Sequence, residues 1–197
     1  MERIAILTIF QDFNPGYSLS GIVLDQYRML KEYGHHVSIF TCERFNESTI
    51  PSGIVNVENK IPFGHLVDYH SQDQLSDEHK GLVQKTAIVL EQYLKNYDVV
   101  FAHDWTFQGW NLPYGLGLIQ AARKLSHIRF FHWIHSIPSR HSDWWRIDKW
   151  GYNHRIVYPN RTDAIQVAEQ FRTNLSKIRI IHHIKDLRSF WEFQPES

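Results

Sequence analysis

A histidine and an aspartate that directly follow an apolar segment are the first candidates for chemistry in this chain. His103 and Asp104 come immediately after the segment DVVFA. An imidazole at the end of a strand can act as an acid, a base or a hydrogen-bond donor, and an adjacent carboxylate can orient the hydroxyl groups of a ligand. The pair therefore predicts an acid–base site. The alternative is structural, since Asp104 could simply cap the segment that follows it.

Polar and aromatic residues also follow other apolar segments. The turn FNPGYS contains Gly16 and Tyr17, Trp105 directly follows the His–Asp pair, and the turn PNR contains Asn160 and Arg161. We expect these loops to bind substrate, because exposed aromatic rings at a cleft commonly pack on the apolar faces of sugars or bases. Alternatively, Gly16 supplies only a permissive backbone conformation, and the tryptophans are buried in the core. The tryptophans near these loops are Trp105, Trp110, Trp144, Trp145 and Trp150.

A metal site is the other possibility that thirteen histidines raise. His132 and His135 lie three residues apart in one strand-like segment, and alternation places them on opposite faces of a regular strand. The neighbours His182 and His183 point apart for the same reason. The single cysteine, Cys42, cannot form an internal disulfide or a thiolate zinc site by itself. We therefore expect no metal, and a metal-dependent hydrolase is a minor alternative.

Charge and hydropathy exclude several classes of protein. Twenty-one basic residues balance 21 acidic ones, so net charge does not indicate a nucleic-acid or membrane-surface partner. The longest apolar runs, IAILTIF and DVVFA, are far shorter than the ~20 residues of a membrane span. No secretory signal is predicted, and the lone cysteine favours a reducing cytoplasm. Neither G-x-G-x-x-G nor a P-loop ending in G-K-[ST] occurs, which argues against a dehydrogenase or a P-loop ATPase.

Alternating strands and helices must position the candidate residues. The run RIAILTIF at 3–10 is apolar throughout, as expected of a strand covered on both faces in a parallel sheet. The alternation predicts one doubly wound α/β domain over residues 1–197, with a mostly parallel Rossmann-like sheet and helices on both faces. The ligand should then lie beyond the carboxyl ends of the strands. Further strands are expected at 36–41, 98–102, 129–134, 155–158 and 178–182, helices at 73–96, 113–126 and 161–173, and mostly loop at 43–72 with a short strand-like piece, GIVNVEN.

The order of these segments resembles the amino-terminal half of a GT-B glycosyltransferase, in the group that includes glycogen synthases and many retaining, sugar-nucleotide-dependent transferases. LDQYRMLKEYGHHVSIFT resembles the family's first helix, which closes on G-H-x-V before the second strand. DVVFAHDW resembles its D-v-v-h-a-H-D-W segment, and RFFHWIHSIP its t-i-H-n strand. IVYPNRTDAIQVAEQF and KIRIIHHIKDLRSF resemble the late segment after which the chain crosses to a second domain.

The resemblance implies an acceptor-side domain with Gly16, Asp104 and His135 as site positions. His135 would donate a hydrogen bond near the reacting sugar. The implied reaction transfers a hexose from a nucleotide sugar with retention, without a metal or a covalently bound cofactor. The sequence departs from the family at 16–18, where Gly-Gly is expected, and at 183–185, where Asn-Gly is expected.

The family's second domain, which binds the sugar nucleotide and carries E-x7-E, has no counterpart in this sequence. The resemblance therefore implies that activity requires a donor-domain partner chain, and a homo-oligomer is also plausible. The alternative is a non-catalytic binding module derived from a glycosyltransferase.

Overall fold

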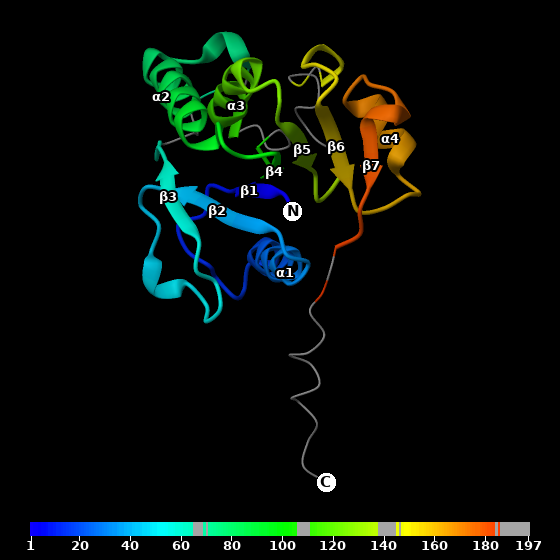
Figure 1. Ribbon diagram of the computed structural model, residues 1–197. Helices are drawn as coiled ribbons and strands as arrows, with labels where there is room; N and C mark the ends of the chain where they lie inside the picture. The colour runs from blue at the N-terminus through cyan, green and yellow to red at the C-terminus, as the bar shows by residue number, and fades with distance from the viewer. Residues whose placement is uncertain are drawn as a thin grey trace.

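A parallel β-sheet forms the centre of the domain (Figure 1) in the computed structural model, which describes residues 1–64, 69, 71–105, 111–137, 145, 147–183 and 185. Within these residues the sheet has seven strands in the order β3-β2-β1-β4-β5-β6-β7, and all neighbouring strands are parallel. The predicted doubly wound, Rossmann-like α/β fold is confirmed. The strands are β1 (Arg3–Leu7), β2 (His36–Cys42), β3 (Val57–Ile61), β4 (Val99–His103), β5 (Arg129–Trp133), β6 (His154–Tyr158) and β7 (Ile178–Ile180).

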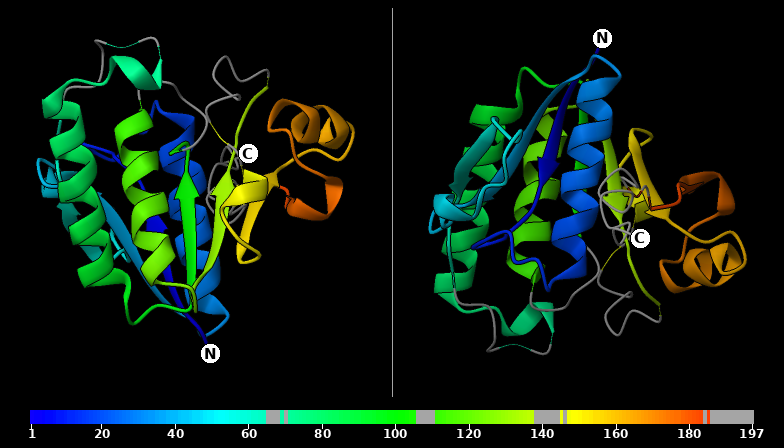
Figure 2. Two further views of the ribbon diagram at one scale, coloured as in Figure 1. Left: turned by 90° about the horizontal axis from the view of Figure 1, so that it is seen from above. Right: turned by 90° about the horizontal axis from the view of Figure 1, so that it is seen from below.

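Helices cover both faces of the sheet. Figure 1 shows α2 and α3 above the sheet and α1 below it, and the two views of Figure 2 bring each side to the front in turn. None of the helices in the described part of the chain is long and apolar enough to cross a membrane. The α-helices are α1 (Ser18–Glu32), α2 (Asp77–Leu94), α3 (Leu112–Lys124) and α4 (Ala164–Gln170), and the short 3-10 helices are η1 (Glu47–Thr49), η2 (Gln72–Gln74), η5 (Ile147–Lys149) and η6 (Leu175–Lys177).

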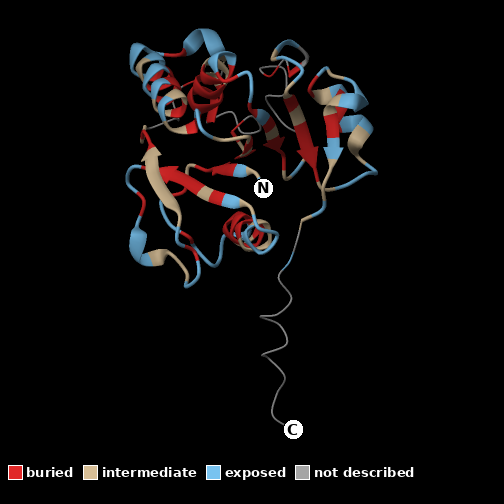
Figure 3. Cartoon of the chain, in the orientation of Figure 1, coloured by how far each residue is buried: buried red, intermediate tan, exposed pale blue. Residues whose placement is uncertain are grey.

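The central strands are apolar on both faces because helices cover both. In β1, Ile4 and Ile6 pack in the core on the α1 side, whereas Ala5 and Leu7 pack in the core that contains α2 and α3. Figure 3 shows the buried residues concentrated along the inner strands and on helix sides that face them. The continuous apolar run at 3–10 therefore indicates a strand at the centre of the sheet, as expected for parallel sheets.

Several element boundaries differ from the sequence prediction. The strand expected at 3–10 ends at Leu7, and the helix expected at 161–173 spans only Ala164–Gln170. Part of the segment 43–72 forms β3, which pairs with β2 through contacts such as Ile39 with Val57. Its sequence VENKI has weak hydropathy because β3 is an edge strand. Helix α2 begins after Ser76, whose side chain accepts a hydrogen bond from the His79 backbone and caps the helix.

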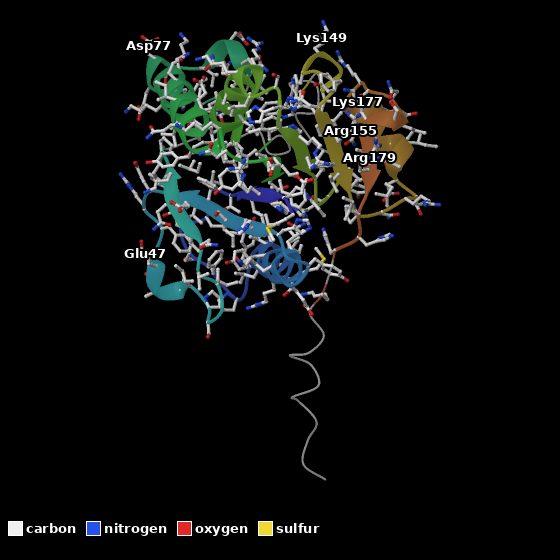
Figure 4. All side chains as sticks on the ribbon, viewed as in Figure 1. Glu47, Asp77, Lys149, Arg155, Lys177 and Arg179 are labelled. Carbon is white, nitrogen blue, oxygen red and sulfur yellow. The ribbon has the colours of Figure 1, made fainter. Side chains whose placement is uncertain are left out.

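The neutral net charge hides an uneven distribution. Residues 149–185 contain seven lysines and arginines but only two acidic residues, a local net charge of +5. Figure 4 shows Lys149, Arg155, Lys177 and Arg179 together around β6 and β7. Each of these residues precedes its strand or is the strand's second residue, so the group lies toward the amino edge of the sheet. The carboxyl edge, where a ligand is expected, is on the opposite side.

Helices α2 and α3 approach each other closely at Gly117. A Cβ atom there would lie 2.8 Å from Thr86 Cβ and 3.0 Å from the Val83 carbonyl oxygen. We expect Gly117→Ala to lower the free energy of unfolding by about 1–2 kcal/mol, since the cost of overpacking exceeds the gain in helix propensity. Gly81 on α2 is the matched control, because a Cβ atom added at that position would meet no atom within 4 Å.

Gly81→Ala should raise the free energy of unfolding by about 0.5–1 kcal/mol through helix propensity alone. Urea unfolding monitored by circular dichroism measures both variants. A Gly117→Ala domain as stable as the Gly81→Ala domain would show that the two helices can separate at no cost, contrary to their close packing at Gly117.

Candidate functional site

A pocket of about 260 Å³ lies where the strand order reverses, between β1 and β4. In open parallel sheets this topological switch point is the usual place of ligand binding. The predicted site residues Tyr17, His103 and Asp104 all line this pocket. A larger pocket of about 450 Å³ lies beside α2, and none of the predicted site residues lines it. The remaining residues that line the switch-point pocket are Ile9, Phe10, Gln11, Asp12, Leu19 and Asn111.

Asp104 has an unusual backbone and an unusual carboxyl group. Its φ is +59°, in the left-handed region that only one other non-glycine residue among those described adopts. Oδ1 is buried without a hydrogen-bond partner among the described residues, and burial raises the pKa of the carboxyl to about 7. Backbone strain of this kind is concentrated at functional sites. Helix α3 has Asn111 at its N-cap, so Asp104 does not cap it.

The Asp104 turn is held by two hydrogen bonds. The Asn111 side-chain amide donates to the Asp104 carbonyl oxygen at 2.7 Å, and the Asp104 backbone amide donates to the Trp133 carbonyl at 3.2 Å. A carboxyl group with a pKa near 7 is present in both protonation states at neutral pH. It can therefore either accept a hydrogen bond from a ligand hydroxyl or donate one.

Three histidines far apart in the sequence form a hydrogen-bonded chain that begins at His103, which lines this pocket. His103 Nδ1 lies 3.0 Å from His135 Nε2, and His135 Nδ1 lies 3.0 Å from His183 Nε2. At the inner end, His103 Nε2 lies 3.0 Å from Gln26 Oε1 on α1. The His103 ring also stacks on Trp133, with centroids 5.4 Å apart. We call Gln26, His103, His135 and His183 the histidine chain.

Strand alternation explains why the histidine chain assembles on one face. Val99 and Phe101 of β4 pack on the α1 side, and His103, two residues further, points the same way toward Gln26. His135 follows β5 and lies two residues beyond Trp133, so the two side chains point to the same face of the sheet. The adjacent parallel strands β4 and β5 thus deliver His103 and His135 to the same side of the carboxyl edge, whereas His183 follows β7, which β6 separates from β5.

Burial keeps the histidine chain neutral. It lowers the pKa of His103 well below its ordinary value, and the neighbouring histidines act in the same direction. Burial and the nearby His183 lower the pKa of His135 to about 3. The pKa of His183 is lowered by burial and by the charge of Lys185. The three rings of the histidine chain are therefore uncharged at neutral pH, and each ring has one donor and one acceptor nitrogen.

A second histidine pair lies on the opposite face of the sheet. His132 Nε2 is 2.9 Å from His154 Nδ1, and the two rings stack with their centroids 5.2 Å apart. Both residues are buried. The expectation that His132 and His135 lie on opposite faces agrees with these separate partners. No group of three or more histidine, cysteine, aspartate or glutamate side chains within the described residues could hold a metal ion.

Other predicted site residues lie elsewhere. Gly16 adjoins Tyr17, but its φ is not positive, so the turn does not require glycine for that reason. Trp105 is only 1% exposed and packs beside Tyr114 in the core, which corrects the expectation of an exposed ring. Asn160 and Arg161 follow β6 and do not line the switch-point pocket, and Asn160 bonds to Asp163. Trp110 and Trp144 lie outside the described residues.

The sequence did not predict Gln26 or His183 as part of the candidate site. The sequence shows His183 only as one of two adjacent histidines, and its partner His135 is 48 residues away. Gln26 lies 77 residues from His103, on the sheet-facing side of α1. The one signal available in the sequence was that Gln26 is a polar residue next to Tyr27, on the side of the helix that is buried.

Comparison with solved structures finds similar folds in two glycosyltransferases and a UDP-GlcNAc 2-epimerase. A glycosyltransferase from Rickettsia africae ESF-5 has a TM-score of 0.56 and 13% identity, covering 92% of this chain and 42% of that one. An alpha-glucosyltransferase in complex with UDP-glucose and DNA containing an abasic site has a TM-score of 0.60 and 9% identity, and the match covers 100% of this chain and 46% of that one. UDP-GlcNAc 2-epimerase from Methanocaldococcus jannaschii has a TM-score of 0.53 and 16% identity, and the match covers 92% of this chain and 46% of that one.

At these identities the likeness shows the fold alone, and the chain spans less than half the length of each of the three proteins. No curated protein sequence matches the chain significantly. The sequence profile of a glycosyltransferase family, however, matches residues 22–188, from the first turns of α1 to beyond β7. The matched region includes the histidine chain and the Asp104 turn, and the chain belongs to Glycosyltransferase Family 4.

Proposed function

We propose that this chain is the acceptor-side domain of a glycosyltransferase and that it binds a sugar acceptor in the switch-point pocket. The observation that carries the proposal is the convergence of Tyr17, His103 and Asp104 on one pocket at the carboxyl edge of the sheet. Such a pocket is where open α/β sheets bind ligands. Family membership supports the reaction class, and the UDP-sugar complexes of proteins with the same fold support a nucleotide sugar as co-substrate.

Asp104 is the residue best suited to hold the acceptor. Its buried carboxyl has an oxygen without a hydrogen-bond partner, and leaving that oxygen unpaired costs free energy that a ligand hydroxyl recovers. Tyr17 lies across the same pocket at the N-cap of α1. In the proposed reaction these groups orient the acceptor hydroxyl, and a donor domain supplies the groups that bind the diphosphate.

The remaining features of the proposal come from the family resemblance. The sugar is transferred with retention of configuration, and the donor domain is part of a partner chain or of a longer form of this protein. No metal is assigned to this domain, and the histidines His103, His135 and His183, like the pair His132 and His154, already bond to one another. The cytoplasm is the proposed location for a different reason, which is that a lone cysteine favours a reducing compartment.

Replacement of Asp104 tests the acceptor site. We expect calorimetry with a panel of mono- and disaccharides to identify at least one ligand of the wild-type chain. Asp104→Asn should weaken its binding at least about tenfold, since hydrogen bonds to a charged group contribute about 1.5–3 kcal/mol. Asp77→Asn is the matched control, because the Asp77 side chain is fully exposed on α2.

The control variant should bind like the wild-type chain. If no saccharide bound, or if Asp104→Asn bound as tightly as Asp77→Asn, the acceptor site proposed at the switch point would be wrong. A saccharide that binds and is never glycosylated, even with a donor domain present, would instead favour the binding-module alternative.

A further inference from the structure

The histidine chain has a direction because of the residue at its inner end. The Gln26 Oε1 atom can only accept a hydrogen bond, so His103 Nε2 must carry the proton that joins them. A neutral His103 then has a bare Nδ1, which accepts from His135 Nε2. By the same logic His135 Nδ1 accepts from His183 Nε2. One amide oxygen on α1 thus sets all three rings to the tautomer protonated at Nε2.

The outer end of the chain is the part that can meet a ligand. Both ring nitrogens of His135 are engaged, at 3.0 Å from His103 and at 3.0 Å from His183. His135 therefore has no ring N–H left for a sugar, although the family resemblance implied such a bond. His183 Nδ1 has no hydrogen-bond partner among the described residues, and the ring is only partly buried.

We propose that His183 is the ligand-facing histidine of this site, where its Nδ1 accepts a hydrogen bond from a hydroxyl group of the sugar ligand. Gln26, His103 and His135 are positioning residues that hold its ring and its tautomer. The proposal rests on the proposed function for the identity of the ligand. His103 lines the switch-point pocket, and the ring centroids from His103 to His135 and from His135 to His183 are 5.2 Å apart at each step. In this proposal the ligand extends out of the pocket past His103 and along these rings to His183.

The surroundings of His183 favour an acceptor. Among the described residues, the His183 ring faces the neutral ring of His135 and the charged Lys185, whose ammonium group also lies close to Gly21 in the first turns of α1. A nearby ammonium disfavours the imidazolium form, as does partial burial. The lone pair on Nδ1 is therefore available at neutral pH. Trp133 stacks along the whole chain, with its ring centroid 6.4 Å from that of His183, and restricts tilting of the rings.

Nuclear magnetic resonance of the ¹⁵N-histidine-labelled chain tests the tautomers without any ligand. At neutral pH we expect His103, His135 and His183 to be protonated at Nε2. Gln26→Leu removes the acceptor and should give His103 a mixture of tautomers, whereas Gln26→Glu retains an acceptor oxygen and should retain the wild-type pattern. The His132–His154 pair lies on the other face and serves as an internal reference that should not change.

A His183 protonated at Nδ1 in the wild-type chain would overturn the proposal. So would tautomers that are the same in Gln26→Leu as in Gln26→Glu. If Gln26→Leu does not fold, the wild-type spectrum alone still decides the direction of the chain.

Saccharide binding tests the ligand-facing role separately. With the saccharide that binds in calorimetry, His183→Ala should weaken binding about tenfold, and the His183 Nδ1 resonance should shift on titration. His182→Ala is the matched control, because His182 is the adjacent, exposed histidine. Equal losses in the two variants would exclude the role of His183. If no saccharide binds at all, the proposed function fails, and the tautomer spectrum still reports the histidine chain independently.

Discussion

The domain is expected to lose at least about 2 kcal/mol of its free energy of unfolding when the pH falls from about 7.5 to about 5. Burial is the main reason that the pKa of His135 is about 3 and that of His154 about 4 in the folded domain. An unperturbed histidine in the unfolded chain has a pKa of about 6.5. Between these values the unfolded chain binds protons that the folded domain does not. Stability therefore rises with pH in this window and is lost as the pH falls below about 6.5.

At about pH 5, His135 and His154 each lower the free energy of unfolding by about 2 kcal/mol, and the lowered pKa values of His103 and His132 act in the same direction. Asp104 makes the opposing contribution. The pKa of Asp104 is raised to about 7 by burial, so the folded domain holds a proton there that the unfolded chain has released above about pH 4. This contribution is lost as the pH rises through 7, and lowering the pH to about 5 restores about 2–3 kcal/mol of it.

Urea unfolding between about pH 5 and pH 8 measures the net effect. The Asp104→Asn variant isolates the histidines, because it lacks the opposing carboxyl group. Its loss of stability on acidification should exceed that of the wild-type domain by about 2 kcal/mol. A wild-type domain whose free energy of unfolding is flat across this range would contradict the buried, neutral state of the histidines.

The isolated 197-residue chain is expected not to transfer sugar at a measurable rate, whereas a complete two-domain form should be at least about 10⁵-fold faster. Transfer requires the donor and the acceptor to be held in a near-attack geometry, which is worth about 7–11 kcal/mol of the barrier. The chain spans 42–46% of the length of the three solved proteins compared above, which share its fold. The isolated domain also leaves the reacting groups open to water, which weakens electrostatic stabilisation of the transition state.

An assay of nucleotide release from a panel of nucleotide sugars, with the saccharide identified by calorimetry, measures this difference. The donor domain is supplied in trans or as a carboxy-terminal extension of the chain. Asp104→Asn in the complete form should reduce the rate, and Asp77→Asn should not. Sustained turnover by the isolated, monomeric chain would show that it already contains a complete site.

The sequence by itself determined the fold class and the edge of the sheet at which the candidate site residues meet. Apolar runs such as RIAILTIF and DVVFA and the helical stripes between them are local patterns, and each can be recognised within about ten to twenty residues. The adjacency of His103 and Asp104 was equally local, and parallel strands deliver such residues to one edge whatever the details of packing. The edge strand β3 was less visible because its sequence VENKI carries little of the apolar pattern.

Only the tertiary structure decided which groups meet at that edge and in what chemical state. The histidine chain joins Gln26, His103, His135 and His183 across separations of 77, 32 and 48 residues, which no local pattern encodes. Burial by neighbouring strands and helices sets the lowered pKa of His135 and the raised pKa of Asp104. The tautomer of each ring depends on its partner, and the partner depends on strand order and register. Residue types are local properties, whereas protonation and hydrogen bonding are properties of the packed whole.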